Sequence, residues 1–230
     1  MSWLTRYLKS SIGMKQIMGV TGLLLVAFLI AHLLGNLQVY LGRDVFNAYA
    51  VKLRELGPLL WIARAGLVVL VVLHIGVAVR LTAMNRAARP VRYRVFRPKV
   101  TPLYARTMAW SGLIIFAFVV FHLLHFTFGT VFHDYYSLTD AKGRHDVYSM
   151  LVLGFRQPAV SVSYIIAMAL LCFHLAHGIP SLFQSVGLSH PKYDRAIERV
   201  GLALAWILFV GFTSIPVAVL LGWVAPPAGV

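Results

Sequence analysis

The sequence predicts an all-α integral membrane protein, and three observations support this fold class. Hydrophobic residues make up 60% of the 230 positions and charged residues only 12%, which excludes an ordinary soluble domain. Apolar windows of about 20 residues, the length that crosses a bilayer as a helix, recur along the chain. These windows are too long and too uniformly apolar for barrel strands, and lipid offers no partner to open backbone groups, so they are expected to be helices.

Five transmembrane helices are expected in one membrane domain, residues 1–230, with the first four forming a bundle. The first window is too long for a cleaved signal peptide and lacks a small-residue cleavage pattern. The expected spans are residues 15–40, 59–84, 103–130, 158–184 and 200–223. Between the first two spans, the spacing of Phe46, Tyr49, Ala50, Leu53 and Leu56 predicts a short helix on the surface.

The basic residues predict the orientation. Residues 85–100, between the second and third spans, carry six Lys and Arg and no acid, so this connection should face the cytoplasm. The amino terminus and the fourth connection then lie on the same side, and the connections hold twelve basic residues inside against six outside. A multi-pass protein of a bacterial-type inner membrane is expected. The net charge of +14 does not indicate nucleic acid, because the basic residues lie beside apolar spans and not in an aromatic-interleaved patch.

Each of the first four apolar windows contains a histidine well inside it: His32, His74, His122 and His174. A buried polar side chain without a partner costs roughly 2–7 kcal/mol, and ionisable groups inside a span mark functional sites. Neutral imidazole is also a common metal ligand. Two such helices side by side can bind one haem iron from both faces, so four histidines predict two haems. The alternative for any single histidine is a buried, hydrogen-bonded structural role.

Depth along the helices predicts how the four histidines pair. At about 1.5 Å per residue, His32 and His122 lie roughly 27 and 28 Å from the inner edge, whereas His74 and His174 lie roughly 15 and 14 Å from it. We therefore expect an outer haem iron held by His32 and His122 and an inner haem iron held by His74 and His174.

Two further histidines follow the third and fourth at a spacing of three residues, His125 and His177. Residues i and i+3 share a helix face, so spacing alone does not choose the ligand in either pair, although depth favours His122 over His125. Each spare histidine is expected either to contact a propionate or quinone, or to bond a backbone carbonyl.

Several motifs together resemble one family. They are KQIMGVTGLLLVAFLIAHLLGNLQ in the first span, FNAYA before the second, a single histidine in the second, FHLLH in the third and FHLAHGIPSLFQSVGL closing the fourth. Over nearly its whole length the chain resembles the single-polypeptide, two-haem cytochrome b anchors of succinate:quinone oxidoreductases, which are the membrane part of complex II and of fumarate reductases. In that family the first and third ligand helices share the outer haem, which agrees with the pairing from depth.

The resemblance implies two haems b, menaquinone or another quinone as substrate, and docking to an iron–sulfur subunit that is itself bound to a flavoprotein. The chain would be the electron-transfer subunit of succinate dehydrogenase or fumarate reductase, without dehydrogenase chemistry of its own. Its lone Cys172 cannot hold an iron–sulfur cluster, and it stands where some family members carry a transmembrane glutamate. The family places an acid near the outer quinone site, which makes Glu55 the candidate proton acceptor. The alternative for Glu55 is an ion pair with Arg54 or Lys52 in water.

Haem propionates need donors near the membrane surface, and five residues lie at the right inner level by span position. Each of them could instead anchor a helix end in lipid headgroups. The candidates are Lys15, Gln16, Arg106, Trp110 and Gln184.

Two rival functions remain at this point. The first is the di-haem cytochrome b subunit of another quinone-linked enzyme. Some of those subunits have their haem ligands on fewer helices, whereas this chain has one candidate ligand on each of its first four helices, which argues against them. The second is a haem-free membrane anchor or a proton-relay transporter that uses intramembrane histidines, although no inverted repeat is evident.

Overall fold

The structure is a computed structural model that describes residues 2–88 and 106–227. Within these ranges the chain is helical, and the only β-type pairing is an isolated bridge between Thr139 and His145. The all-α prediction is therefore confirmed for the described residues.

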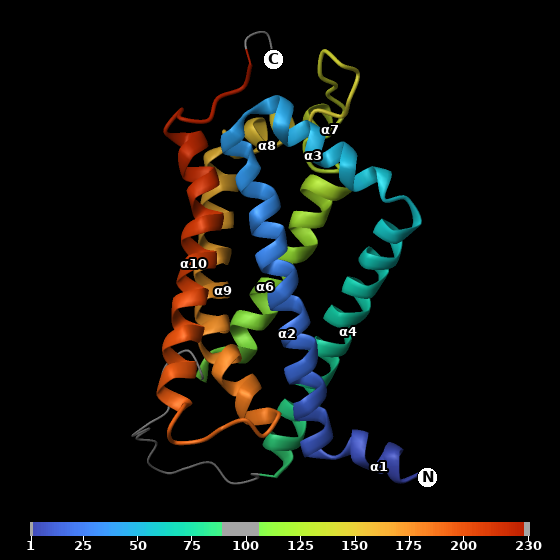
Figure 1. Ribbon diagram of the computed structural model, residues 1–230, viewed down its shortest axis with the longest axis vertical. Coiled ribbons are helices and arrows are strands. Elements are labelled where there is room, and N and C mark those ends of the chain that lie inside the picture. Colours follow the sequence, from blue (N-terminus) through green and yellow to red (C-terminus); the bar gives the residue numbers. More distant parts are fainter. Residues whose placement is uncertain (1, 89–105, 228–230) are drawn as a thin grey trace. The chain divides into compact units, whose positions relative to one another are not determined.

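In the part of the chain that the structure describes, five helices are long and apolar enough to cross a membrane, as expected (Figure 1). Their outward side chains are largely apolar and exposed, which suits a lipid environment. The third continues from an α-helix into a π turn, η2. The helices are α2 (Ser11–Asn36), α4 (Pro58–Ala87), α6 (Met108–His122) with η2 (Leu123–Thr127), α9 (Pro158–Ser185) and α10 (Asp194–Leu220).

The ends of the spans differ from expectation by a few residues. α2 begins four residues earlier than predicted, and α10 begins six residues earlier and ends three earlier. An apolar window measures only the hydrocarbon-matched part, whereas the hydrogen-bonded helix continues into polar residues at the interface. The start of the third span and most of the basic connection lie outside the described residues, including Arg89, Arg92, Arg94, Arg97 and Lys99.

Short helices lie between the long ones. The predicted helix after the first span is present as α3 (Arg43–Glu55), which follows the 3₁₀ helix η1 (Leu37–Leu41). α3 ends at Glu55; Gly57 follows with a φ of +51°, which suits glycine, and Pro58 then begins α4. The others are α1 (Trp3–Lys9), α7 (His133–Tyr136) and α8 (Val147–Phe155).

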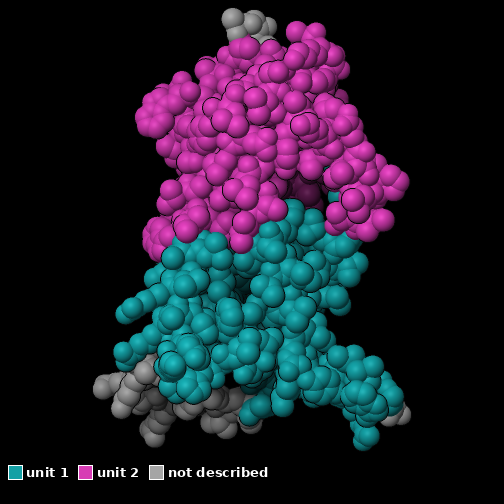
Figure 2. Space-filling model, in the orientation of Figure 1, with its two compact units in different colours: residues 1–28, 64–112, 173–205 teal, residues 29–63, 113–172, 206–230 magenta. Residues whose placement is uncertain are grey.

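The chain divides into two compact units, coloured separately in Figure 2. Every membrane-length helix contributes residues to both, because the division falls within each of them. Unit 1 comprises residues 1–28, 64–112 and 173–205, and unit 2 comprises residues 29–63, 113–172 and 206–230.

The largest apolar core belongs to unit 2 and is built around α8. Val152 is fully buried, and Leu151 and Phe155 pack with it against residues of η1, α9 and α10. The side chain of Asp146 caps α8 by accepting from the backbone N–H of Ser149. Because α8 is buried on most sides, it is an internal part of unit 2 and not a surface segment.

Candidate functional site

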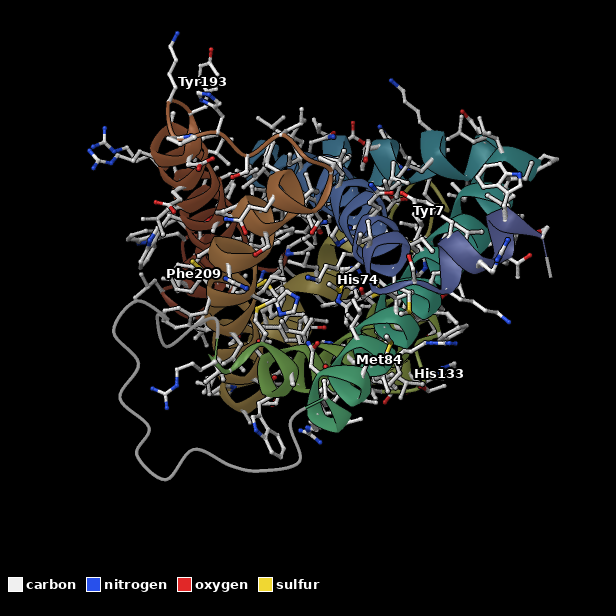
Figure 3. The ribbon with its side chains drawn as sticks, turned by 90° about the horizontal axis from the view of Figure 1, so that it is seen from below. Tyr7, His74, Met84, His133, Tyr193 and Phe209 are labelled. Atoms are coloured by element: carbon white, nitrogen blue, oxygen red, sulfur yellow. The ribbon has the colours of Figure 1, made fainter. Side chains whose placement is uncertain are left out.

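Unit 1 contains the histidines that were expected to share the inner haem. His74 lies on α4 and His174 on α9, and the two are within range of mutual electrostatic interaction. Figure 3 shows His74 pointing from α4 toward the neighbouring helices.

Each of these histidines is hydrogen-bonded to a hydroxyl on a different helix. Nδ1 of His74 lies 3.0 Å from Oγ1 of Thr21 on α2, and Nδ1 of His174 lies 3.2 Å from Oγ of Ser111 on α6. Both hydroxyls donate their own hydrogen to a backbone carbonyl of the preceding turn, at 2.8 and 3.1 Å. When each hydroxyl donates to its carbonyl, it accepts from the imidazole; the hydrogen of the ring is then on Nδ1, and Nε2 keeps a free lone pair, as a metal ligand requires.

A glycine follows each hydroxyl and lets the helix backbone approach the imidazole. A Cβ atom added at Gly22 would lie 3.4 Å from Cε1 of His74, and one at Gly112 would lie 3.5 Å from Cε1 of His174. Longer side chains at either position would therefore occupy the space beside the imidazole.

Unit 2 contains the histidines that were expected to share the outer haem. The ring of His32 on α2 and the ring of His122 at the end of α6 have centroids 5.8 Å apart and are nearly perpendicular, at 89°. Asn36, one turn after His32, donates to the His32 carbonyl at 2.8 Å and lies 3.4 Å from both ring nitrogens. The structure thus brings together the same pairs that depth along the helices predicted.

The separation of these rings fits two ligands of one metal. An imidazole nitrogen binds a metal ion at about 2.0–2.1 Å, and the ring centre lies roughly 1 Å beyond that nitrogen, so two imidazoles that share one ion have ring centres at most roughly 6.4 Å apart. The 5.8 Å between His32 and His122 is slightly shorter than this limit, so the two rings are close enough to share one ion. In unit 1 the hydroxyls beside Nδ1 of His74 and His174 are compatible with ligation of a metal through Nε2.

Tyr164 on α9 lies between the two histidines of the FHLLH motif. Its hydroxyl is 3.3 Å from Nδ1 of His122 and 3.2 Å from Nδ1 of His125. The ring of Tyr164 packs edge-on against Phe118 and Phe155, and only 7% of the residue is exposed.

His125 differs from His122 in its surroundings. Its ring stacks on Phe126 at 3.8 Å, it is 2% exposed, and its buried Nε2 has no hydrogen-bond partner among the described residues. A Cβ atom at Gly154 of α8 would lie 2.7 Å from that nitrogen. The π turn η2 begins directly after His122 and changes the angle between the two histidines from that of a regular α-helix.

His177 lies one turn after His174 on α9, half buried, with Nε2 3.3 Å from the hydroxyl of Ser181. The hydroxyl is on the same helix, so this contact does not reach a second span. The role of His177 stays a prediction, as does that of His125.

The hydroxyls of Thr21 and Ser111 and the phenol of Tyr164 were not anticipated from the sequence, although a signal was present. The segments TGLLLVAFLIAH in α2 and SGLIIFAFVVFH in α6 share a hydroxyl–glycine pair eleven residues before a histidine. Eleven residues is close to three helical turns, so the hydroxyl and the histidine fall on one face of each helix. Polar residues at matched positions in apolar helices would have identified Thr21 and Ser111, but not Tyr164.

The weaker candidates for propionate binding are spread over unit 1. Gln16 accepts a hydrogen bond from the Tyr7 hydroxyl, which joins α1 to α2. Gln184 is exposed and lines a small cavity with residues of α9 and α10. Lys15 and Arg106 are exposed, and Trp110 is 69% exposed. Glu55 is exposed at the end of α3. The roles proposed for these residues stay predictions.

A buried polar network, also unforeseen, joins α3 to the loop before α8 in unit 2. Asp146, whose side chain is fully buried, accepts from Arg43 at 2.6 and 3.0 Å. Asn47, also fully buried, donates to Asp146 and Asp140 and accepts from the backbone N–H of Tyr148. Arg144 links Asp140 to Asp44 of α3.

Burial by itself would raise the pKa values of Asp140 and Asp146, but hydrogen bonds outweigh it. Arg144, Asn47 and backbone N–H groups hold the pKa of Asp140 well below its usual value. Arg43, Asn47 and the Ser149 backbone lower the pKa of Asp146. Both carboxylates are therefore ionised at neutral pH and stabilise the fold in that form.

Comparisons of the chain with protein-family models, with curated proteins and with solved structures give no match.

Proposed function

We propose that this protein is the two-haem cytochrome b membrane anchor of a succinate:quinone oxidoreductase, passing electrons between an iron–sulfur subunit and a quinone. The observation that carries the proposal is the separation of four intramembrane histidines into two pairs, one within each compact unit. A proton-relay role does not require such pairing, whereas axial ligation of two haems does.

The residues of the chain would hold each haem in a defined way. His74 and His174 would bind one iron through Nε2, because Thr21 and Ser111 keep the ring hydrogens on Nδ1. His32 and His122 would bind the other from α2 and α6. Haem iron, when bound, would supply reversible one-electron chemistry. The apolar helix faces around each pair exclude water, and this favours electron transfer over side reactions.

The enzyme complex, the quinone and the bacterial-type inner membrane rest on the motifs that resemble complex II anchors. In this reading Glu55, exposed at the end of α3, accepts or donates protons at a quinone. Purification from the native membrane should recover an iron–sulfur subunit and a flavoprotein, and succinate should reduce the haems. Recovery with a formate, nitrate or hydrogen enzyme would instead favour the rival di-haem cytochromes.

Haem stoichiometry tests the pairing directly. Protein purified gently from its native membrane is expected to contain two b-type haems per chain by pyridine haemochrome. The double variant His32→Ala/His122→Ala should keep one haem, because both changes fall in one site. The double variant His32→Ala/His74→Ala should keep none, because each site loses a ligand.

The control is His190→Ala, which removes an exposed histidine between α9 and α10 and should leave both haems. Equal loss in the two double variants would contradict the pairing. Absence of haem from the wild-type protein would overturn the proposal and favour the proton-relay alternative.

A further inference from the structure

Tyr164 has one hydroxyl hydrogen and two imidazole neighbours. Its oxygen lies 3.3 Å from Nδ1 of His122 and 3.2 Å from Nδ1 of His125. For both contacts to be hydrogen bonds, Tyr164 must donate to one imidazole and accept from the other. The imidazole from which it accepts has its hydrogen on Nδ1 and a bare Nε2, and the other has its hydrogen on Nε2.

The two arrangements have opposite consequences for ligation. If His122 donates to Tyr164 and Tyr164 donates to His125, then Nε2 of His122 is free to bind a metal. If the chain of hydrogen bonds runs the other way, Nε2 of His122 carries a hydrogen and His125 becomes the histidine that is able to bind. One tyrosine thus selects between two histidines that are three residues apart.

The first arrangement places a hydrogen on the buried Nε2 of His125, which has no hydrogen-bond partner among the described residues, but the position of His122 beside His32 favours it. The ring of His122 lies 5.8 Å from that of His32, the separation that a shared metal needs. The ring of His125 is surrounded by Phe121, Phe126, Phe132 and Tyr164, and its Nε2 is buried against Gly154 of α8.

We propose that Tyr164 is the positioning residue that makes His122 the haem ligand, with His125 as the acceptor that fixes the direction of the hydrogen bonds. This inference rests on the proposed function. It also gives the buried His125 a role other than ligation. Because the accepting hydroxyl makes the His122 ring more electron-donating, it favours oxidised iron at that site.

The test uses Tyr164→Phe in the full-length protein, which removes the hydroxyl and keeps the packing ring. The matched control is Tyr148→Phe, since Tyr148 is also buried in unit 2 but donates to the Ala225 carbonyl and not to a histidine. The readouts are the midpoint potential of each haem and the rate at which each haem is lost to apomyoglobin, neither of which is enzyme activity.

Tyr164→Phe is expected to raise the potential of one haem, leave the other unchanged, and weaken retention of the affected haem roughly 10- to 100-fold, the range found for groups that orient metal-binding histidines. Tyr148→Phe should change neither. Two haems with unaltered potentials and retention in Tyr164→Phe would overturn the inference while leaving the proposed function intact, whereas a haem-free wild-type protein would overturn both.

Single alanine variants of the histidines give a second test that does not depend on how Tyr164→Phe folds. His122→Ala should lose one haem, and His125→Ala should keep two, with the potential of one shifted. The reverse result, loss in His125→Ala and retention in His122→Ala, would show that the hydrogen bonds run in the opposite direction.

Discussion

At the scale of the residue, the single hydroxyls of Thr21 and Ser111 orient the imidazoles of His74 and His174. Each accepts from Nδ1 of a histidine and donates to a carbonyl of its own helix, so the direction of both bonds is fixed without a charged group. An acid in the same place would be costly inside a membrane. A neutral hydroxyl orients the imidazole with a much smaller desolvation penalty than a charged group would have.

Removing either hydroxyl should therefore loosen one haem and spare the other. Thr21→Val keeps the shape of the side chain but removes the hydroxyl acceptor beside Nδ1 of His74, and we expect roughly 10- to 100-fold weaker retention of the haem that His74 would bind. The measurement is haem loss followed by visible spectroscopy. Thr82→Val is the control, because the Thr82 hydroxyl bonds only the Ala78 carbonyl on α4; equal effects of the two variants would contradict this role.

At this scale the histidines were predictable from sequence and their neighbours were not. A histidine inside an apolar run is conspicuous, and helical rise alone paired His32 with His122. The choice between His122 and His125 depends on Tyr164, which is about forty residues away along the chain. No local pattern records a contact at that separation.

At the scale of the element, α3 is fixed by polar contacts more than by its apolar face. Arg43 and Asn47 bind two carboxylates in the loop before α8, and Phe46 enters the apolar core of unit 2. The short helix was predictable from its spacing of apolar residues. The network was not, because its acids lie some hundred residues away in a connection without a periodic pattern.

Arg43→Gln should detach this end of α3 from the loop. The change leaves the buried carboxylate of Asp146 without its cation and should lower the free energy of unfolding by about 2 kcal/mol. This is less than the loss expected for a fully buried pair, because Arg43 is 29% exposed. Hydrogen exchange of residues 43–49 and 137–149 in detergent should become faster. Lys142→Gln is the control, since Lys142 and Asp44 are both more than 60% exposed and exposed ion pairs of this kind contribute little to stability.

The same experiment has an expected pH dependence. The pKa values of Asp140 and Asp146 are lower in the folded protein than their usual value, so the stabilisation is present above about pH 4 and is lost as the pH falls through the folded values. The difference between Arg43→Gln and the wild-type protein should accordingly shrink in acid. A difference that does not shrink at all as the pH falls below 4 would show that Arg43 acts through packing and not through its charge.

At the scale of the whole molecule, α2 and α6 have the same arrangement of polar residues. Each helix supplies a hydroxyl–glycine pair to unit 1 and, eleven residues later, a histidine to unit 2. α4 and α9 complete the arrangement with His74 and His174. The number of spans was predictable because hydrophobic length is a property of composition, whereas this reciprocal use of α2 and α6 becomes evident only when the contacts are known.

Labelling of introduced cysteines should establish the orientation of the chain. In a Cys172→Ser background, Lys142→Cys should react with an impermeant maleimide added to intact cells, because the charge distribution places this loop outside. Arg195→Cys, at the start of α10, should react only after permeabilisation. The opposite pattern would mean that the connection from 85 to 100 faces outward despite its basic residues.

The π turn after His122 also affects how related chains would be recognised. It holds one residue more than an α turn, so a single deletion within Leu123–Thr127 converts it to regular helix. Where the deletion removes Leu123 or Leu124, the motif FHxxH becomes FHxH, and side chains two residues apart on a regular helix do not share a face. The second imidazole would then turn away from the tyrosine of α9, so related chains that keep this tyrosine contact should keep both the π turn and the gap of two residues between the histidines.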